Sequence, residues 1–325
     1  MHRFKLSATT AMTVAISLAS GFTLAVDGSS NQTNNSQAGD YPTIAAAIKG
    51  GSAELDFRLR HEEVDVDNMS EDEARALTLR TRVNYTTGRF EGIGISVEMD
   101  NITEIDGNDY PTSPALKNTG NFPGRTVIAD PEGTEINQAY ISYSYGDTLS
   151  KYGRQRINLD NQRFVGGVGF RQNEQTFDAF SIEHTCTAAD TKFYYAHINN
   201  VNRIFGEDDP TLSDTDSSSE IVNINYSGLT AGDIIFYSYL LDEKLTDTQY
   251  DTYGLRFSGE TNGLGYQLEY ANQDRELADG SETEADYILL EGSIDVAGAS
   301  FTLGFENLQS DNANYGFSTP LATGH

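Results

Sequence analysis

Hydrophobic and polar residues alternate with a period of two in three consecutive stretches near the start of the chain. The apolar members of these stretches are Ala53, Leu55, Phe57 and Leu59, then Leu77, Leu79, Val83 and Tyr85, then Ile93, Ile95, Val97 and Met99. The alternating positions are Glu54, Asp56, Arg58 and Arg60, then Thr78, Arg80, Arg82 and Asn84, then Gly94, Ser96, Glu98 and Asp100. Successive side chains of a strand point to opposite faces, so the pattern predicts strands with one apolar and one charged face.

The same reading predicts ten further strands, and the connections alternate in length. These strands lie near residues 135–145, 151–159, 175–185, 191–200, 218–227, 233–242, 250–259, 264–273, 284–294 and 299–308. Short turns are expected at 86–91, 146–150, 186–190, 228–232, 260–263 and 295–298, and mostly longer, more acidic connections between the other strands. Short turns at one end and long loops at the other are typical of outer-membrane barrels. The predicted fold is therefore an all-β, transmembrane, antiparallel up-and-down β-barrel whose first strand runs outward.

A soluble β-sandwich is the main alternative fold, because it also consists of alternating strands. It predicts Greek-key connections and loops of comparable length at both ends. The polar faces here carry arginine and acidic residues, which favours a closed barrel with a charged, water-filled lumen. The residues expected to line that lumen are Arg58, Arg60, Arg80, Arg82, Arg154, Arg156, Arg256, Glu54, Asp56, Glu98 and Asp100.

Composition and charge exclude several other classes. The chain of 325 residues has a mean hydropathy of -0.47, no tryptophan and a formal net charge of -28. Beyond the N-terminus, no apolar run reaches the roughly 18 residues that a spanning helix requires. The negative charge argues against nucleic acid as a partner.

Tyrosine and phenylalanine gather near the predicted strand ends, as expected of interfacial aromatic belts. Those expected beside the short turns include Tyr85, Tyr145, Tyr152, Tyr226, Phe257, Tyr266 and Phe301, and those expected at the other rim include Tyr253, Tyr270, Tyr287 and Phe305.

The N-terminus predicts export. Arg3 and Lys5 precede a short apolar run, and small residues near Ala25 suit cleavage, so residues 1–25 are predicted to be a signal peptide. A polar leader follows over residues 26–50, and residues 41–49 within it are predicted to be helical, ending at Gly50. The barrel is expected over residues 51–325. Bacterial single-chain barrels have an even strand number, so thirteen strands suggest a chain truncated at the C-terminus.

The stretch YGRQRINLDNQRFVGGVGF, which starts at Tyr152, resembles a signature of alginate-export-type outer-membrane porins of Gram-negative bacteria. The stretch LDFRLR from Leu55 looks like the first strand of that family. The resemblance implies sixteen to eighteen strands and diffusion through an arginine-lined pore. By position, Arg154 and Arg156 match the family motif, and the loop after it is matched by Asn158, Asp160, Asn161, Gln162 and Arg163.

Three functions are compatible with these features. The first is a passive porin for small hydrophilic solutes, the second a selective channel for export or uptake of acidic, alginate-like saccharides, and the third a non-conducting structural or adhesive barrel. The inward arginines favour the first two. The expected partners are the lipid bilayer, lipopolysaccharide, the barrel-assembly machinery during biogenesis, and small hydrophilic or anionic solutes.

Enzymatic and metal chemistry find little support in the sequence. Ser181 and His184 lie three apart on one predicted strand and hence on opposite faces. The histidines have no metal-ligand spacing, and the acidic stretch 208–216 lacks a known Ca²⁺-loop pattern. Gly166, Gly167 and Gly169 open no helix and instead suit a loop folded toward the pore. No enzyme activity, cofactor, catalytic residue or metal site is therefore expected.

Overall fold

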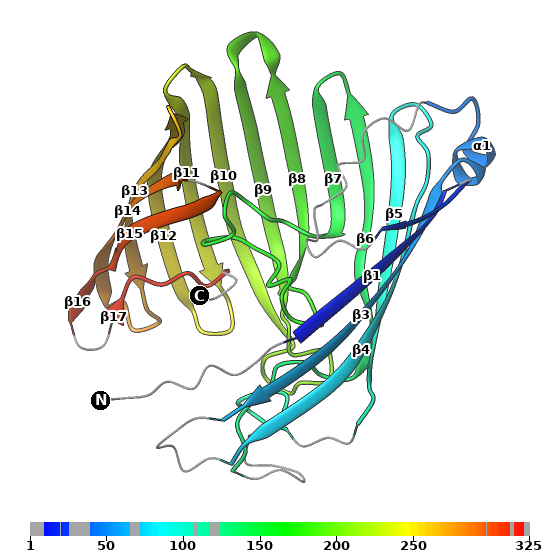
Figure 1. The fold of residues 1–325 in the computed structure, drawn as a ribbon, viewed down its shortest axis with the longest axis horizontal. Helices are drawn as coiled ribbons and strands as arrows, with labels where there is room; N and C mark the ends of the chain where they lie inside the picture. The colour runs from blue at the N-terminus through cyan, green and yellow to red at the C-terminus, as the bar shows by residue number, and fades with distance from the viewer. Residues whose placement is uncertain are drawn as a thin grey trace.

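A computed structural model describes residues 10–19, 21–25, 40–65, 72–106, 110–117, 124–296, 298–312 and 315–321 of the chain. It consists almost entirely of β-strands in one curved sheet (Figure 1). The main strands are β3 (Ser52–Val64), β4 (Ala74–Thr86), β5 (Ile93–Glu104), β6 (Gly133–Tyr145), β7 (Thr148–Gln155), β8 (Thr176–Cys186), β9 (Thr191–Asn202), β10 (Asp214–Leu229), β11 (Gly232–Glu243), β12 (Thr248–Thr261), β13 (Leu264–Glu276), β14 (Glu282–Val296) and β15 (Ala299–Leu308).

The thirteen strands expected from the sequence are present as β3–β15, and each pairs antiparallel with its neighbours in chain order. This up-and-down order confirms the predicted topology and excludes the Greek-key sandwich. The turns at one end of the sheet are short, as expected, and most connections at the other end are longer, except those at 244–247 and 277–281, which are as short as the turns. At the β12–β13 turn, Asn262 and Gly263 have φ values of 51° and 77°, which is the conformation that Asn-Gly favours in two-residue hairpins.

Two strands at the sheet edge fall within the predicted signal peptide. β1 (Thr10–Ala19) pairs with β3, and β2 (Gly21–Ala25) pairs with β1. The fold does not test the predicted signal peptide, which stays a prediction. Its cleavage would remove β1 and β2 and leave β3 at the edge of the sheet. The leader residues 26–39 lie outside the described residues. Within the described residues the sheet is open, with β15 at its other edge, and the expected C-terminal truncation also stays a prediction.

The two faces of the sheet differ as the alternation predicts. On β5, Ile93, Ile95 and Val97 are 43–48% exposed, whereas Glu98 and Asp100, at the alternate positions that follow, are at most 4% exposed. The same alternation appears on β4, β11, β12 and β13, where the concave face is covered and the convex face is not, whereas β15 at the sheet edge is exposed along almost its whole length. The convex face is thus a continuous apolar surface, and the polar face looks inward.

Two segments outside the main sheet cover the concave face. One joins β7 to β8 over residues 156–175, and the other is the C-terminal stretch 315–321 after the small strand β16 (Ser310–Asn312), which pairs with β17 (Tyr315–Gly316). Figure 1 shows both on the inner side of the curved sheet. They bury an aromatic and aliphatic cluster that includes Phe164, Tyr237, Tyr287 and Phe317.

The aromatic-belt prediction needs one correction. Tyr145 and Tyr152 are 76% and 67% exposed on the outer face beside short turns, as the belt requires. Tyr287 is fully buried instead, because its side chain points inward against Phe164 and Phe317. Its assignment to the outer rim was wrong.

One short helix, α1 (Ile44–Lys49), precedes β3. The Thr43 hydroxyl accepts a hydrogen bond from the Ala46 amide at its N-terminus, and Gly50 ends the helix. The expected helix over residues 41–49 is therefore confirmed, three residues shorter than predicted. In the described part of the chain, no helix is long and apolar enough to cross a membrane.

Candidate functional site

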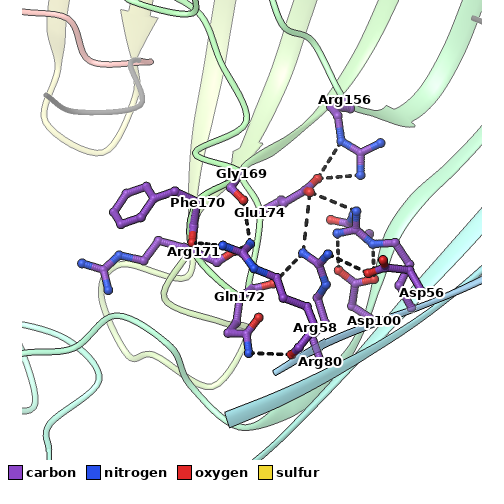
Figure 2. A network of polar contacts seen from close by, with 12 residues as sticks. Asp56, Arg58, Arg80, Asp100, Arg156, Gly169, Phe170, Arg171, Gln172 and Glu174 are labelled. Atoms are coloured by element: carbon purple, nitrogen blue, oxygen red, sulfur yellow. Dashed lines mark hydrogen bonds and ion pairs between the residues drawn. The ribbon is translucent and has the colours of Figure 1, made fainter. Parts of the chain in front are cut away.

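The candidate site is the inward segment, defined as residues 156–175, together with the charged inner face of β3–β5 that it contacts (Figure 2). Glu174 is the centre of the contact. Its carboxylate lies 2.5 Å from Arg156 Nη2 and 2.9 Å from Arg82 Nη1, and Arg80 Nη1 is 3.8 Å away. Three guanidinium groups, two from β4 and one from the segment itself, thus converge on one buried carboxylate.

Arg58 binds the backbone of the same segment. Its guanidinium donates to the carbonyl oxygens of Gly169, Phe170 and Arg171 at 2.8, 2.6 and 3.0 Å. The five N–H donors of arginine form a planar fork that suits several acceptors at once. Arg58 therefore holds the inner turn of the segment against β3.

A second group of ion pairs fixes the same end of the segment. Arg60, which is 1% exposed, pairs with Glu62 at 2.7 Å and with Asp130. Arg171 of the inward segment also reaches Glu62 at 2.9 Å, and Asp130 accepts from the Gln172 amide at 3.0 Å. The connection between β5 and β6, which carries Asp130, is thereby tied to the inward segment.

The other end of the inward segment contacts β10–β15 on the opposite wall. Asp160 accepts from Asn223 at 2.8 Å and lies 3.1 Å from Arg256 Nη2. Arg163 pairs with Glu306. The ring of Phe164 lies 5.1–6.1 Å from those of Tyr237, Tyr239, Tyr287 and Phe317. The segment therefore bridges two walls of the interior.

Local hydrogen bonds shape the segment between these two anchors. Asn158 Oδ1 accepts from the Gly167 amide at 2.7 Å, and Asn161 Oδ1 accepts from the Arg163 amide at 3.2 Å. Gln162 has a φ of 60° and its amide donates to the Leu159 carbonyl. The predicted loop motif, Asn158, Asp160, Asn161, Gln162 and Arg163, therefore lies within the inward segment, as the glycine-rich sequence after it suggested.

The C-terminal stretch meets the inward segment in the interior. The Gly166 amide donates to the Leu321 carbonyl at 2.9 Å, and Gln175 Nε2 donates to the same carbonyl at 3.3 Å. Arg203, from the loop after β9, donates to the Pro320 carbonyl at 2.8 Å. The two segments thus act as one partition across the inner side of the sheet.

Ten of the eleven residues expected to line the lumen lie on the inner face. Arg58, Arg60, Arg80, Arg82, Arg156, Arg256, Asp56, Glu98 and Asp100 make the polar contacts described above or pair with one another, and Glu54 faces inward opposite Asn84. The arginines are not free, however. Protein acceptors hold them, and Arg60, Arg80 and Arg256 are at most 8% exposed.

Arg154 is the exception, and its assignment to the lumen was wrong. It lies opposite Ala139 on β6, and its neighbour Tyr152 lies opposite Ile141; both Tyr152 and Ile141 are exposed on the convex face. Opposed residues of paired strands share a face, so Arg154 points outward. There its Nε donates to Asp178 at 2.9 Å. β7 ends at Gln155, four residues before the predicted end, so Arg156 no longer follows the strand alternation.

Charges balance within the site. Arg82 forms ion pairs with Glu98, Asp100 and Glu174. Arg156 pairs with Glu98 and Glu174, and Arg80 pairs with Asp56 at 2.9 Å. Burial alone would raise the pKa of the Glu174 carboxyl, but Arg156, Arg82 and Arg80 outweigh it and hold that pKa well below its ordinary value. Glu174 is therefore ionised at any physiological pH.

Sequence reasoning missed the acceptors that hold the arginines. Glu174, Asp130 and Gln172 lie outside the strands, where side-chain alternation predicts nothing. Asn173, Glu174 and Gln175 directly before β8 are polar residues that are nonetheless buried. The signal available in the sequence was only their proximity to the glycine-rich stretch.

Metal binding finds no support in the described residues. No group of three or more histidine, cysteine, aspartate or glutamate side chains there is arranged to hold a metal ion. Each carboxylate at the centre of the site faces an arginine instead, so its chemistry is ion pairing.

Comparisons with known proteins agree with this architecture. A family model described as alginate export matches residues 52–284. OccAB1 of Acinetobacter baumannii is similar in structure, with a TM-score of 0.60 and 13% identity over 81% of this chain and 68% of that one. OccK8 (OprE) of Pseudomonas aeruginosa has a TM-score of 0.56 and 15% identity over 80% of this chain and 69% of that one. No curated protein matches the chain.

A further solved structure, Pseudomonas aeruginosa OpdK with vanillate, has a TM-score of 0.56 and 11% identity, and covers 80% of this chain and 67% of that one. At these identities the structural likenesses establish the fold. The apolar convex face, the barrel-wall topology and the family match place the protein in the outer membrane of a Gram-negative cell. The family model spans well over half of the sequence, and the chain belongs to the alginate-export family.

Proposed function

We propose that the protein is a passive diffusion channel for small hydrophilic solutes, whose narrowest part is set by the inward segment. The observation that carries this proposal is the bridge made by residues 156–175 across the polar inner side of an otherwise apolar-coated sheet. A barrel serving only as structure would gain nothing from a charged inner face held in register by a loop.

The path proposed for solutes runs beside the inward segment. A cavity of about 200 Å³ lies there against β7–β10, lined by Lys151, Gln155, Tyr194, Asn223 and Asn225 among others. Amide, hydroxyl and ammonium groups can replace part of the hydration shell of a polar solute, while an apolar solute gains no such replacement. Selection in this account depends on size and polarity.

A selective channel for acidic saccharides is the second candidate. The family description and the positive groups Lys151, Arg156 and Lys192 around the cavity favour it, since guanidinium and ammonium groups bind carboxylates. The general channel is preferred because the arginines already have acceptors: Arg156 pairs with both Glu98 and Glu174. Block of the current by acidic oligosaccharides, but not by neutral ones of equal length, would favour the second candidate.

The two arginines of the sequence motif, Arg154 and Arg156, should differ in their effect on the ion selectivity of the channel. Single channels of the full-length protein in planar bilayers should conduct, and Arg156→Gln should lower the anion-to-cation permeability ratio by about two-fold. In water, a unit charge about 4 Å from a passing ion contributes about 1 kcal/mol. Arg154→Gln should leave the ratio unchanged, because Arg154 pairs with Asp178 on the outer face. The reversal potential in a salt gradient measures both.

Two outcomes of these measurements would contradict the proposal. Absence of conductance in the unmodified protein would leave the non-conducting barrel as the better account. Equal shifts for both substitutions would mean that Arg156 does not border the path.

A further inference from the structure

Helix α1 is fixed to the turn between β4 and β5. The Tyr41 amide donates to the Arg89 carbonyl at 2.7 Å, and the Gly88 amide donates to the Ala47 carbonyl at 2.9 Å. The Tyr85 hydroxyl donates to the Ile48 carbonyl. These bonds attach both ends of the helix to the short-turn end of the sheet, where Figure 1 shows it.

The helix lies on the convex side of the sheet. Tyr85 follows Val83 at a spacing of two, and Val83 is 41% exposed on the apolar outer face. A Cβ atom on Gly51 would lie 2.5 Å from the Tyr85 hydroxyl, so glycine allows the chain to pass close to that ring. Tyr85 thus connects α1 to the surface that faces lipid.

One side of α1 is apolar and uncovered. Ile44 and Ile48 are 62% and 52% exposed, whereas Ala47 is 4% exposed against the sheet. Residues four apart lie on the same side of a helix, so the two isoleucines form one ridge. Lys49 follows in the last turn and is also exposed. The lipid-facing surface continues on β5 with Ile93 and Ile95, which are 48% and 47% exposed.

We propose that α1 is an interfacial anchor that binds the phospholipid leaflet on the periplasmic side. Ile44 and Ile48 enter the boundary between headgroups and acyl chains, and Lys49, on the adjacent side of the helix, stays in the water above it, which is the arrangement of amphipathic helices lying in a membrane surface. Continuity with the apolar face of β4 and β5 favours lipid over a separate protein as the occupant. This role is independent of what the channel transports.

The absence of tryptophan from the chain makes a direct test possible. Ile48→Trp introduces a single tryptophan on the ridge, and Lys49→Trp places one on the adjacent side of the same helix. Leu268→Trp, at a position 46% exposed on the outer face of β13, reports full contact with acyl chains. The full-length proteins are reconstituted into phosphatidylcholine vesicles with and without lipids brominated near the headgroup.

Brominated lipid should reduce the tryptophan emission of Ile48→Trp at least about two-fold, because this residue lies at the acyl boundary. It should reduce the emission of Lys49→Trp much less. Ile44→Trp provides a second reporter and should behave like Ile48→Trp. Equal quenching of Ile48→Trp and Lys49→Trp, or none in either, would overturn the proposal. So would an emission change that depends on the protein-to-lipid ratio and not on bromine, because it would identify a second copy as the occupant.

Discussion

Glu174→Gln should release the inward segment and raise the single-channel conductance about two-fold or more. The substitution leaves Arg80, Arg82 and Arg156 around a neutral amide in a site where Glu174 is almost fully buried. Removing one partner of a buried ion pair typically costs about 3–5 kcal/mol, because the remaining charge is uncompensated. The segment then loses its main attachment to β4, and the open fraction of the lumen grows.

Glu183→Gln is the matched control for this substitution. Glu183 also lies on the inner side of the wall, where it lines the cavity, and it pairs with the half-exposed Lys192 at 2.9 Å. Its neutralisation changes the lumen charge by the same unit without touching the inward segment. A conductance increase of equal size in both variants would contradict the account, since the effect would then come from charge alone.

The lowered pKa of Glu174 predicts how the stability of the inward segment, and with it the conductance, depends on pH. A carboxyl whose pKa is lower in the folded state contributes stability above its unfolded pKa of about 4.3 and loses it as pH falls through the folded value. Because Arg156, Arg82 and Arg80 outweigh burial and lower that pKa, the unmodified channel should keep its conductance between neutral pH and about pH 4.3.

Trypsin should cleave the inward segment at least about ten-fold faster in the Phe164→Ala variant than in the unmodified protein. The Phe164 ring fills the aromatic cluster around Tyr237 and Phe317, and removing a buried phenylalanine side chain costs about 3–5 kcal/mol. Local opening of a segment becomes more frequent as its packing weakens. Cleavage after Arg163 or Arg171, followed by mass spectrometry, measures the opening.

Phe170→Ala is the control within the same segment. Phe170 is 51% exposed, and the guanidinium groups of Arg60 and Arg171 lie 5.4 and 4.7 Å from the centre of its ring. Cation–π contacts at such sites contribute about 0.5–1 kcal/mol, so the digestion rate should change little. Similar rates for the two variants would show that the aromatic cluster does not hold the segment.

The strands and their faces could be predicted because a barrel wall obeys a local rule. Each residue from Ile95 to Asp100 of β5, for example, reports its face by its own polarity, with Val97 outside and Glu98 inside. The alternation of side chains between the two faces no longer applies beyond the end of a strand. Arg154 and Arg156 look equivalent in the sequence, but β7 stops between them and they point to different sides.

The acceptors of the arginines could not be predicted for a related reason. Arg58 and Gly169 are 111 residues apart and meet only because the inward segment folds across the interior. Its path depends on the aromatic cluster around Phe164 and on contact with Leu321, and neither leaves a periodic pattern. The sequence therefore predicts a charged inner face and a loop folded toward it, but not which acceptors that loop brings to the arginines.

The most direct test of the central claim compares the unmodified full-length protein with a variant whose residues 160–173 are replaced by a short glycine-serine link. Deletion removes the bridge but leaves β7 and β8 in place. We expect both proteins to conduct in planar bilayers, with a several-fold larger single-channel conductance in the variant. Identical conductance in the two proteins would show that the inward segment does not narrow the path.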